Sequence, residues 1–204
     1  IAAVMDGYAD DTGAVARRRA AYHVAVDAHD DVRATLTAAL AACGVTVVGP
    51  DVPLESDLGF GLSLVLNEGA QPRLDPQRCS RWLRAGVPHL AVAVAGGTVR
   101  ISPVITPTVT GCIRCAALAD DERDGTTLAH VGLSVTPDVP VRHRLRAAPP
   151  TVHLAIGHAI GRLLAHIDRL PGPVDQLVID ALGSYTSLPV PPHPHCGCTF
   201  AGLG

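Results

Sequence analysis

Lysine is absent from this chain of 204 residues, and its sixteen cationic side chains are therefore all arginines. Without lysine, the chain can supply neither a Schiff base nor the phosphate-binding lysine of a Walker-type loop. Charged residues make up only 17% of the sequence and the net charge is −3, which excludes a disordered chain or a charged coiled coil. Aromatic residues contribute only 3%, and the short arginine clusters have acidic neighbours, so no nucleic-acid partner is expected.

Long apolar runs are also missing. The longest is far shorter than the roughly 20 residues that cross a membrane, so no membrane partner is expected. Apolar residues nevertheless make up 48% of the chain, enough to build a core at this length. Residues 1–6 lack the features of a secretion signal, and we expect a cytoplasmic protein. We expect one domain over residues 1–204, from which an upstream N-terminal part could be missing.

Four of the six cysteines form two short-spaced pairs: Cys112 with Cys115, and Cys196 with Cys198. The spacing of the first pair lets both thiolates reach one ion, and Gly197 gives the second pair unusual backbone freedom. Four thiolates suit tetrahedral zinc in a closed structural site. Two disulfides or a redox dithiol are the alternatives, but neither a secretion signal nor a thioredoxin-like unit supports them.

Other sulfur and imidazole groups have simpler interpretations. His193 and His195 flank the second cysteine pair and could replace a thiolate as metal ligands, although turn positions in a proline-rich segment explain them as well. Cys43 and Cys79 each stand alone, and we expect both to pack in the core.

Apolar periodicity and turn signals predict alternating strands and helices. The predicted helices cover residues 30–43, 75–84, 116–124 and 151–170. The predicted strands cover residues 1–6, 22–28, 45–48, 62–66, 89–94, 98–105 and 176–182, and an extended segment covers 187–194. Residues 10–19 are predicted to form a polar turn, and 125–149 a long loop. This order predicts an α/β fold with a largely parallel sheet flanked by helices, closed at one end by the zinc site.

Three segments resemble a known family: "AGVPHLAVAV" (85–94), "TGCIRCAALADDERD" (110–124) and "PPHPHCGC" (191–198). They are similar to the carboxyl-terminal part of ThiF/MoeB-like proteins, the adenylating group related to ubiquitin-activating enzymes. The match is closest to the actinobacterial branch that partners YcaO enzymes in making azole- or azoline-containing (TOMM-type) peptides. The resemblance covers about residues 75–198. It implies a ThiF-like, Rossmann-related fold, a homodimer, and structural zinc held by the four paired cysteines.

The nucleotide site of the adenylating relatives is matched only in part. Their glycine-rich loop has no counterpart near the start of the chain, and the fragment Gly59–Gly61 leads into a strand instead of a helix. The resemblance implies that Asp6 could be the acid that ends their second strand and that Arg17 could bind phosphate. A solvated turn acid and a polar surface turn are the alternatives. The relatives' lysine is missing, and Glu68 is at best a displaced substitute for their magnesium-binding aspartate.

The resemblance therefore implies a zinc-stabilised partner protein that does not adenylate. Such a protein would bind a ribosomal precursor peptide on a groove or exposed sheet edge and present it to a YcaO-type cyclodehydratase. The alternative is an adenylating enzyme that uses ATP and Mg²⁺ to activate a carboxylate. Its glycine-rich loop would lie before Ile1, and Cys79 would be its candidate acceptor thiol. A third interpretation is a zinc-stapled structural subunit of a larger complex.

Overall fold

A computed structural model describes residues 12–67, 72–123 and 148–198 of the chain. The helices are α2 (Thr12–Ala21), α3 (Asp30–Ala42), α4 (Pro76–Arg84), α5 (Ile113–Arg123) and α6 (Pro149–Ile167). The strands are β1 (His23–Ala28), β2 (Thr46–Val48), β3 (Gly59–Leu66), β4 (His89–Ala95), β5 (Thr98–Ile101), β6 (Gln176–Ile179) and β7 (Tyr185–Leu188).

The strands form a seven-stranded sheet in the order β2-β1-β3-β4-β5-β6-β7. β1 pairs in parallel with β2 and β3, and β3 pairs in parallel with β4. The remaining neighbours are antiparallel, so β2, β1, β3, β4 and β6 point one way and β5 and β7 the other. The predicted α/β fold with a mostly parallel sheet is confirmed.

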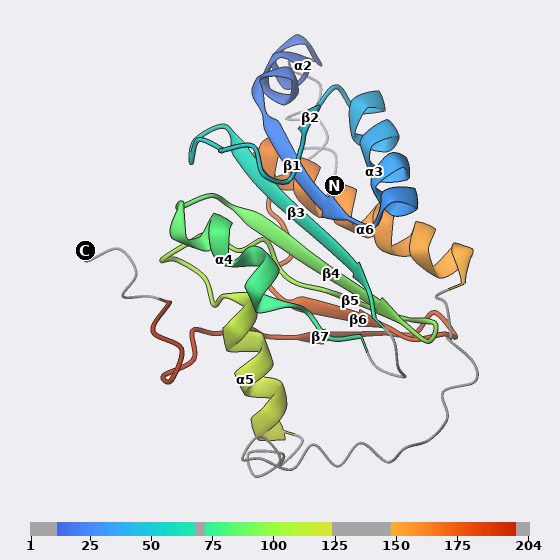
Figure 1. Cartoon of the computed structure of the whole chain (residues 1–204), viewed down its shortest axis with the longest axis vertical. Coiled ribbons are helices and arrows are strands. Elements are labelled where there is room, and N and C mark those ends of the chain that lie inside the picture. Colours follow the sequence, from blue (N-terminus) through green and yellow to red (C-terminus); the bar gives the residue numbers. More distant parts are fainter. Residues whose placement is uncertain (1–11, 68–71, 124–147, 199–204) are drawn as a thin grey trace, which may run out of the picture.

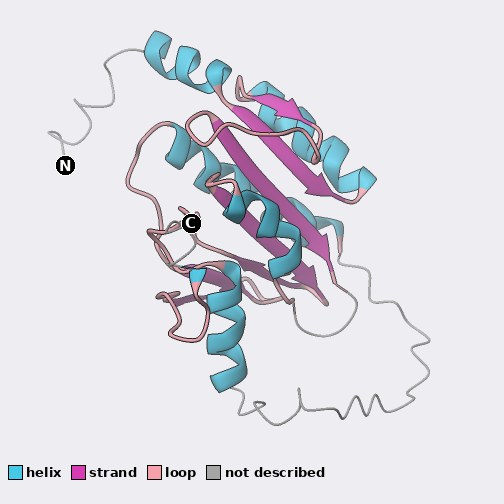
Figure 2. Ribbon diagram, turned by 60° about the vertical axis from the view of Figure 1, so that its left-hand side comes forward, coloured by secondary structure: helices cyan, strands magenta, loops and turns pink. Residues whose placement is uncertain are grey.

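Helices cover both faces of this sheet (Figures 1 and 2). On one face α3 and α6 pack through fully buried leucines such as Leu36 and Leu163, which join the cluster around Phe60 of β3. On the other face α4 and α5 pack through Trp82 and Ile113. The cysteine pairs belong to this second cluster, so the candidate metal centre lies on the α4–α5 side of the sheet.

Helix α4 shows why its predicted bounds were accurate. Asp75 is the N-cap, and its side chain accepts a hydrogen bond from the backbone N–H of Gln77 at 2.9 Å. Pro76 occupies the first turn, where its missing N–H costs nothing. After the helix, Gly86 adopts a φ of +71°, in the left-handed region that favours glycine. These local signals place the helix without help from tertiary contacts.

Several predicted features differ from the structure. The polar turn predicted over residues 10–19 is largely helix α2, because alanine and arginine favour helix and no proline interrupts them. The strand predicted to reach residue 105 ends at Ile101, shortly before Pro103. Gly157 and Gly161 lie four residues apart on α6, a spacing that can let another element approach a helix, but an added Cβ at either would have nothing within 4 Å among the described residues.

Two predicted segments cannot be compared with the structure. The predicted strand over residues 1–6 and nearly all of the loop over 125–149 lie outside the described residues. Within the part of the chain that is described, no helix combines the length and the apolar character needed to span a bilayer.

Candidate functional site

The structure brings the four paired cysteines together into one cluster. Cys112 lies just before α5 and Cys115 lies in its first turn, while Cys196 and Cys198 follow the extended segment after β7. Their Sγ atoms all lie within 4.8 Å of one another. Two segments more than 80 residues apart therefore meet at a point that could hold a metal ion.

The sulfur separations fit a common ion better than disulfides. The Sγ atoms of Cys112 and Cys196, and those of Cys115 and Cys198, are 3.4 Å apart, and those of Cys112 and Cys115 are 3.8 Å apart. A disulfide bond measures only about 2.05 Å, and all four cysteines are free. Four sulfurs at about 2.3 Å from a tetrahedral ion would lie roughly 3.8 Å from one another. The donor set and its spacing therefore fit a tetrahedral metal site.

Two glycines allow this close convergence. A Cβ on Gly111 would lie 2.3 Å from the carbonyl oxygen of Val190 and 2.7 Å from that of Pro191. Only glycine therefore lets the segment before α5 contact the segment after β7. Gly197 has a φ of +72°, which lets the backbone turn between Cys196 and Cys198. Of these, Gly197 could be singled out from sequence, because it separates two closely spaced cysteines.

Burial and mutual repulsion keep most of these thiols protonated in the absence of an ion. Burial is the main cause that raises the pKa of Cys112, Cys196 and Cys198 to about 11. Burial also pushes up the pKa of Cys115, but hydrogen bonds from the backbone N–H of His193 and from neighbouring thiols outweigh it and lower that pKa. Metal binding must therefore displace protons, and a bound cation would replace the repulsion between thiolates with attraction.

His193 supports the cluster from outside. Its backbone N–H donates to Sγ of Cys115 at 3.2 Å. Its Nδ1 accepts the backbone N–H of His195 at 3.2 Å, so Nε2 carries the proton and donates to Glu122 at 3.0 Å. Neither histidine belongs to the group that could hold the metal. Their positions agree with the turn interpretation instead of the ligand one.

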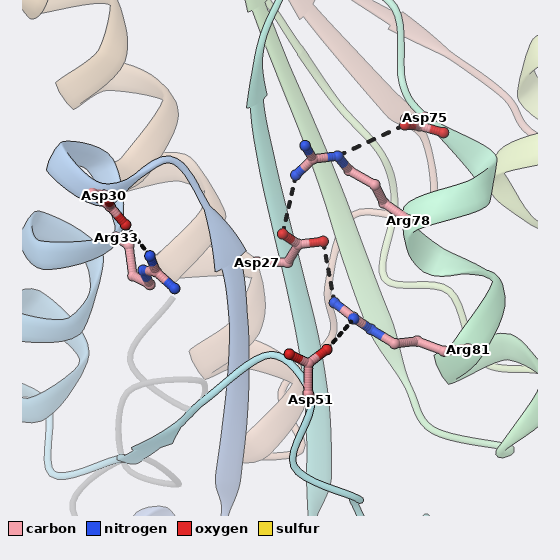
Figure 3. Close-up of polar contacts among 7 residues, drawn as sticks. All are labelled: Asp27, Asp30, Arg33, Asp51, Asp75, Arg78 and Arg81. Atoms are coloured by element: carbon pink, nitrogen blue, oxygen red, sulfur yellow. Dashed lines mark hydrogen bonds and ion pairs between the residues drawn. The ribbon is translucent and has the colours of Figure 1, made fainter.

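A second polar cluster lies near the carboxyl end of β1 (Figure 3). Asp27 of β1 accepts hydrogen bonds from Arg78 at 3.0 Å and from Arg81 at 3.1 Å, both on α4. Arg81 also reaches Asp51, in the loop after β2, at 3.2 Å, and Arg78 approaches Asp75 at 3.7 Å. We call these five residues the Asp27 network.

The Asp27 network occupies the position where open α/β sheets bind their ligands. β1 has β2 on one side and β3 on the other, so the chain changes direction across the sheet at this point. Ligands of such folds bind outside the carboxyl ends of the strands at this reversal, with phosphate at the N-terminus of the helix that follows. Here the turn from β1 into α3 reads Ala28-His29-Asp30-Asp31 and holds no glycine. Both acids lie in the first turn of α3.

Only one of the two residues predicted to contact nucleotide can be placed relative to this edge. Asp6 lies outside the described residues. Arg17 is exposed on α2, which leads into the start of β1, so it lies at the opposite end of that strand from Asp27 (Figure 1). Its neighbour Arg19 pairs with Asp168 at the end of α6. The acid that follows the second strand of the described β1-α3-β2 unit is Asp51.

The two lone cysteines pack in the core as predicted. Cys79 is 2% exposed, and Cys43 is half-buried against the other core cluster. Burial, with help from nearby Asp75, raises the pKa of Cys79 to about 12. Its thiol is therefore neutral at ordinary pH, which is unfavourable for a nucleophile.

Comparison with solved structures identifies proteins that have a similar fold. The chain is similar to the heterocyclase TruD, with 19% identity and a TM-score of 0.63 over 91% of this chain and 28% of that one. A heterocyclase bound to substrate and cofactor gives 17% identity and a TM-score of 0.63, covering 91% and 26% of the two chains. MccB of E. coli gives 12% identity and a TM-score of 0.64, covering 91% and 67%. This chain shares their fold.

The similarity extends over nearly all of this chain but only part of its neighbours. The chain spans little more than a quarter of the length of the heterocyclases. MccB has also been solved with AMPCPP and the peptide MccA, at a TM-score of 0.61 to this chain. No protein-family model and no curated protein matches the sequence. The ThiF-like resemblance is thus supported at the level of the fold.

The Asp27 network was missed by sequence analysis. Its members come from three separate segments and carry no motif, and the pair Asp27 and Arg81 is 54 residues apart. A signal was available in the strand order: residues 23–48 form a strand-helix-strand unit, and Asp51 is the acid that follows its second strand.

Proposed function

We propose that this chain is a zinc-stabilised, non-adenylating ThiF-like protein that binds a ribosomal precursor peptide and presents it to a YcaO-type cyclodehydratase. The observation that carries the proposal is the fold shared with a heterocyclase and with MccB. The acidic, glycine-free turn between β1 and α3 adds an argument against nucleotide binding at that turn. A protein of this fold could bind a peptide without binding a nucleotide. The residues described here favour peptide binding.

The turn into α3 is unfavourable for a nucleotide. Glycine normally lets the backbone approach phosphate at this turn, and the N-terminus of the helix then attracts its negative charge. In this chain Asp30 and Asp31 already place negative charge in the first turn of that helix. Each would repel a phosphate by about 1 kcal/mol at 4 Å in water and by more where solvent is excluded. Together with the absence of lysine, this supports a protein that does not adenylate.

The arginines near this edge are also engaged. Arg78 and Arg81 contact Asp27, whose side chain is only 20% exposed. Phosphoryl and adenylyl transfer depend on cations that are free to neutralise developing charge. Withdrawing either arginine would cost this half-buried carboxylate one of its two partners, which supports a structural role for the network.

Zinc is the metal that best fits the four-thiolate cluster. Soft thiolates select zinc or an iron–sulfur cluster, and a closed tetrahedral set leaves no open position for water. Bound zinc would supply a stable cross-link between the start of α5 and the segment after β7. The four cysteines would hold the ion, and His193 would orient Cys115 through its backbone N–H.

Two titrations test the proposal. Magnesium-ATP added to the folded, zinc-loaded protein should give no binding heat, and the protein should not exchange pyrophosphate into ATP. A candidate precursor peptide encoded beside this chain should bind, with or without ATP. Micromolar, magnesium-dependent ATP binding that is lost in Asp51→Asn would favour the adenylating enzyme instead. Failure of every candidate precursor to bind would favour a structural subunit.

A further inference from the structure

A pocket of about 670 Å³ lies beside the metal centre, and Asp75 is the one lining residue that it shares with the Asp27 network. One wall is α4, the other is the start of α5 with the second cysteine pair, and His89 at the start of β4 also lines it. The volume is in the range of sites that hold small molecules or several peptide residues. Nothing in the proposed zinc site or in the Asp27 network requires such a space.

His89 contributes a polar group to this pocket. The residue is 1% exposed, and its Nδ1 lies 2.9 Å from the carbonyl oxygen of Val87. A carbonyl can only accept, so Nδ1 carries the proton and Nε2 is a bare acceptor. Burial lowers the pKa of His89 to about 4, which keeps the ring neutral. No hydrogen bond to Nε2 is found among the described residues, so a ligand that donates a hydrogen bond would satisfy it.

The mouth of the pocket is positively charged. Arg84 ends α4 and Arg114 lies in the first turn of α5; both are exposed and line the pocket. Neither has an ion-pair partner among the residues described. Asp75, the one carboxylate among the lining residues described, is engaged as the N-cap of α4 and by Arg78. The pocket therefore combines an acceptor inside with two outer arginines that are unpaired among the described residues.

The remaining walls suit an inserted side chain. Leu83 and Ile113 contribute apolar surface, and Cys79 contributes a neutral thiol. The phosphates of a nucleotide could pair with the two arginines. However, the end of α4 that lines the pocket is a poor phosphate site, because it begins with the carboxylate of Asp75 and with Pro76, which lacks a backbone N–H donor. A peptide matches the combination of apolar wall, buried acceptor and separated cations.

We propose that this pocket binds an acidic peptide segment, with one hydroxyl-bearing side chain inserted to donate to Nε2 of His89 and flanking carboxylates on Arg84 and Arg114. This deepens the proposed function and rests on it for the assignment of the ligand as a peptide. The pocket would then be the place where the precursor is held, separate from the edge at which nucleotides bind in related folds.

A fluorescence-anisotropy experiment with defined probes tests this pocket. The probes are three labelled nonapeptides: alternating glutamate and serine, the same with alanine for serine, and the same with lysine for glutamate. The first should bind the intact protein most tightly. The alanine peptide should bind several-fold more weakly, because Nε2 of His89 stays unpaired. The lysine peptide should bind at least tenfold more weakly, and added salt should reduce the differences due to charge.

Protein variants identify the surface. Arg84→Ala and Arg114→Ala are at exposed positions and should each weaken the glutamate–serine peptide about threefold, and roughly tenfold together. Arg169→Ala, which removes an exposed charge beyond α6, should not change binding. His89→Asn keeps a donor for Val87 but places no acceptor at the position of Nε2, and should make the serine and alanine peptides bind equally. The arginine variants remain informative if His89→Asn does not fold.

The outcomes separate this inference from the proposed function. Absence of binding by all three peptides, or equal binding of the glutamate and lysine peptides, would overturn the inference. So would binding that is unchanged in the double arginine variant. If a precursor peptide binds but ignores both arginines, the pocket assignment fails while the proposed function stands. If the acidic probe binds through the arginines but no precursor binds, the pocket assignment stands and the proposed function fails.

Discussion

Removal of one thiol from the metal cluster should measure how much the fold depends on it. Cys196→Ser leaves three thiolates and a hydroxyl, a weaker ligand for zinc. The affected link is long: Cys112 and Cys196 are separated by 84 positions in sequence, and the ion is the only covalent-strength connection proposed between their segments. We therefore expect both loss of metal and a large fall in the free energy of unfolding.

The size of that fall follows from the loop that the metal closes. By the chain-entropy relation for cross-links, a loop of this length stabilises the folded state by about 4.5 kcal/mol. Native-state strain and residual structure in the unfolded chain would reduce the measured value. With a urea dependence of about 2 kcal/mol per molar, the unfolding midpoint should move down by up to roughly 2 M.

The assay is urea unfolding followed by circular dichroism, with bound zinc counted in the same samples. The matched control is Cys43→Ser, which changes a half-buried cysteine outside the cluster. We expect about one zinc per chain in the parent and the control, and none in Cys196→Ser after dialysis. The reasoning fails if Cys196→Ser loses its zinc yet unfolds at the parent's urea concentration, or if the control falls by the same amount.

Three further predictions concern protons and packing. Zinc affinity should rise with pH between 6 and 8, because three of the thiols have a pKa of about 11 and must lose protons on binding. Competition with a chromogenic chelator measures this affinity, and an affinity that does not change with pH would contradict thiolate ligation. Gly61→Ala should destabilise the protein by about 1–3 kcal/mol in urea, because its Cβ would lie 2.2 Å from the Trp82 ring. Gly157→Ala, with nothing within 4 Å, should instead be neutral or stabilise α6 by up to about 1 kcal/mol; similar effects at the two glycines would refute the packing argument. His89 has a folded-state pKa of about 4, below the 6.5 of an unfolded histidine, so its contribution is complete above pH 6.5 and is lost as the pH falls towards 4. Acid titration of urea midpoints should show this slope in the parent and not in His89→Asn.

Local signals account for most of what could be predicted of the fold. The Asp75-Pro76 start and Gly86 end define α4, and the continuous apolar run from His89 defines a strand buried on both faces. Helix α2 was missed because its three consecutive arginines look like a surface turn. Its place in the structure depends partly on Arg19, which reaches Asp168 almost 150 residues away. No local pattern contains that contact.

The metal cluster could be predicted from the sequence, whereas the other polar sites could not. Two cysteine pairs carry their own spacing signal, so their convergence was predictable although the segments are far apart. The pocket at His89 carries no such signal, because a lone histidine in an apolar run is usually a core residue. Its place in the lining of the pocket, together with the hydrogen bond that already engages Nδ1, distinguishes it. Asp6 lies outside the described residues and stays a prediction.

The long sequence separation of the two cysteine pairs also has a consequence during synthesis. Ribosomes add roughly 5–20 residues per second, so the 84 positions between Cys112 and Cys196 correspond to about 4–17 seconds of elongation. Throughout that interval the first pair has emerged without the ligands that complete its shell. We expect β1, β3 and β4 to pair before the four cysteines can bind one ion. Until then, the first two thiols depend on a reducing environment to stay reduced. Metal binding is then a late step of biogenesis, and it follows the formation of the sheet.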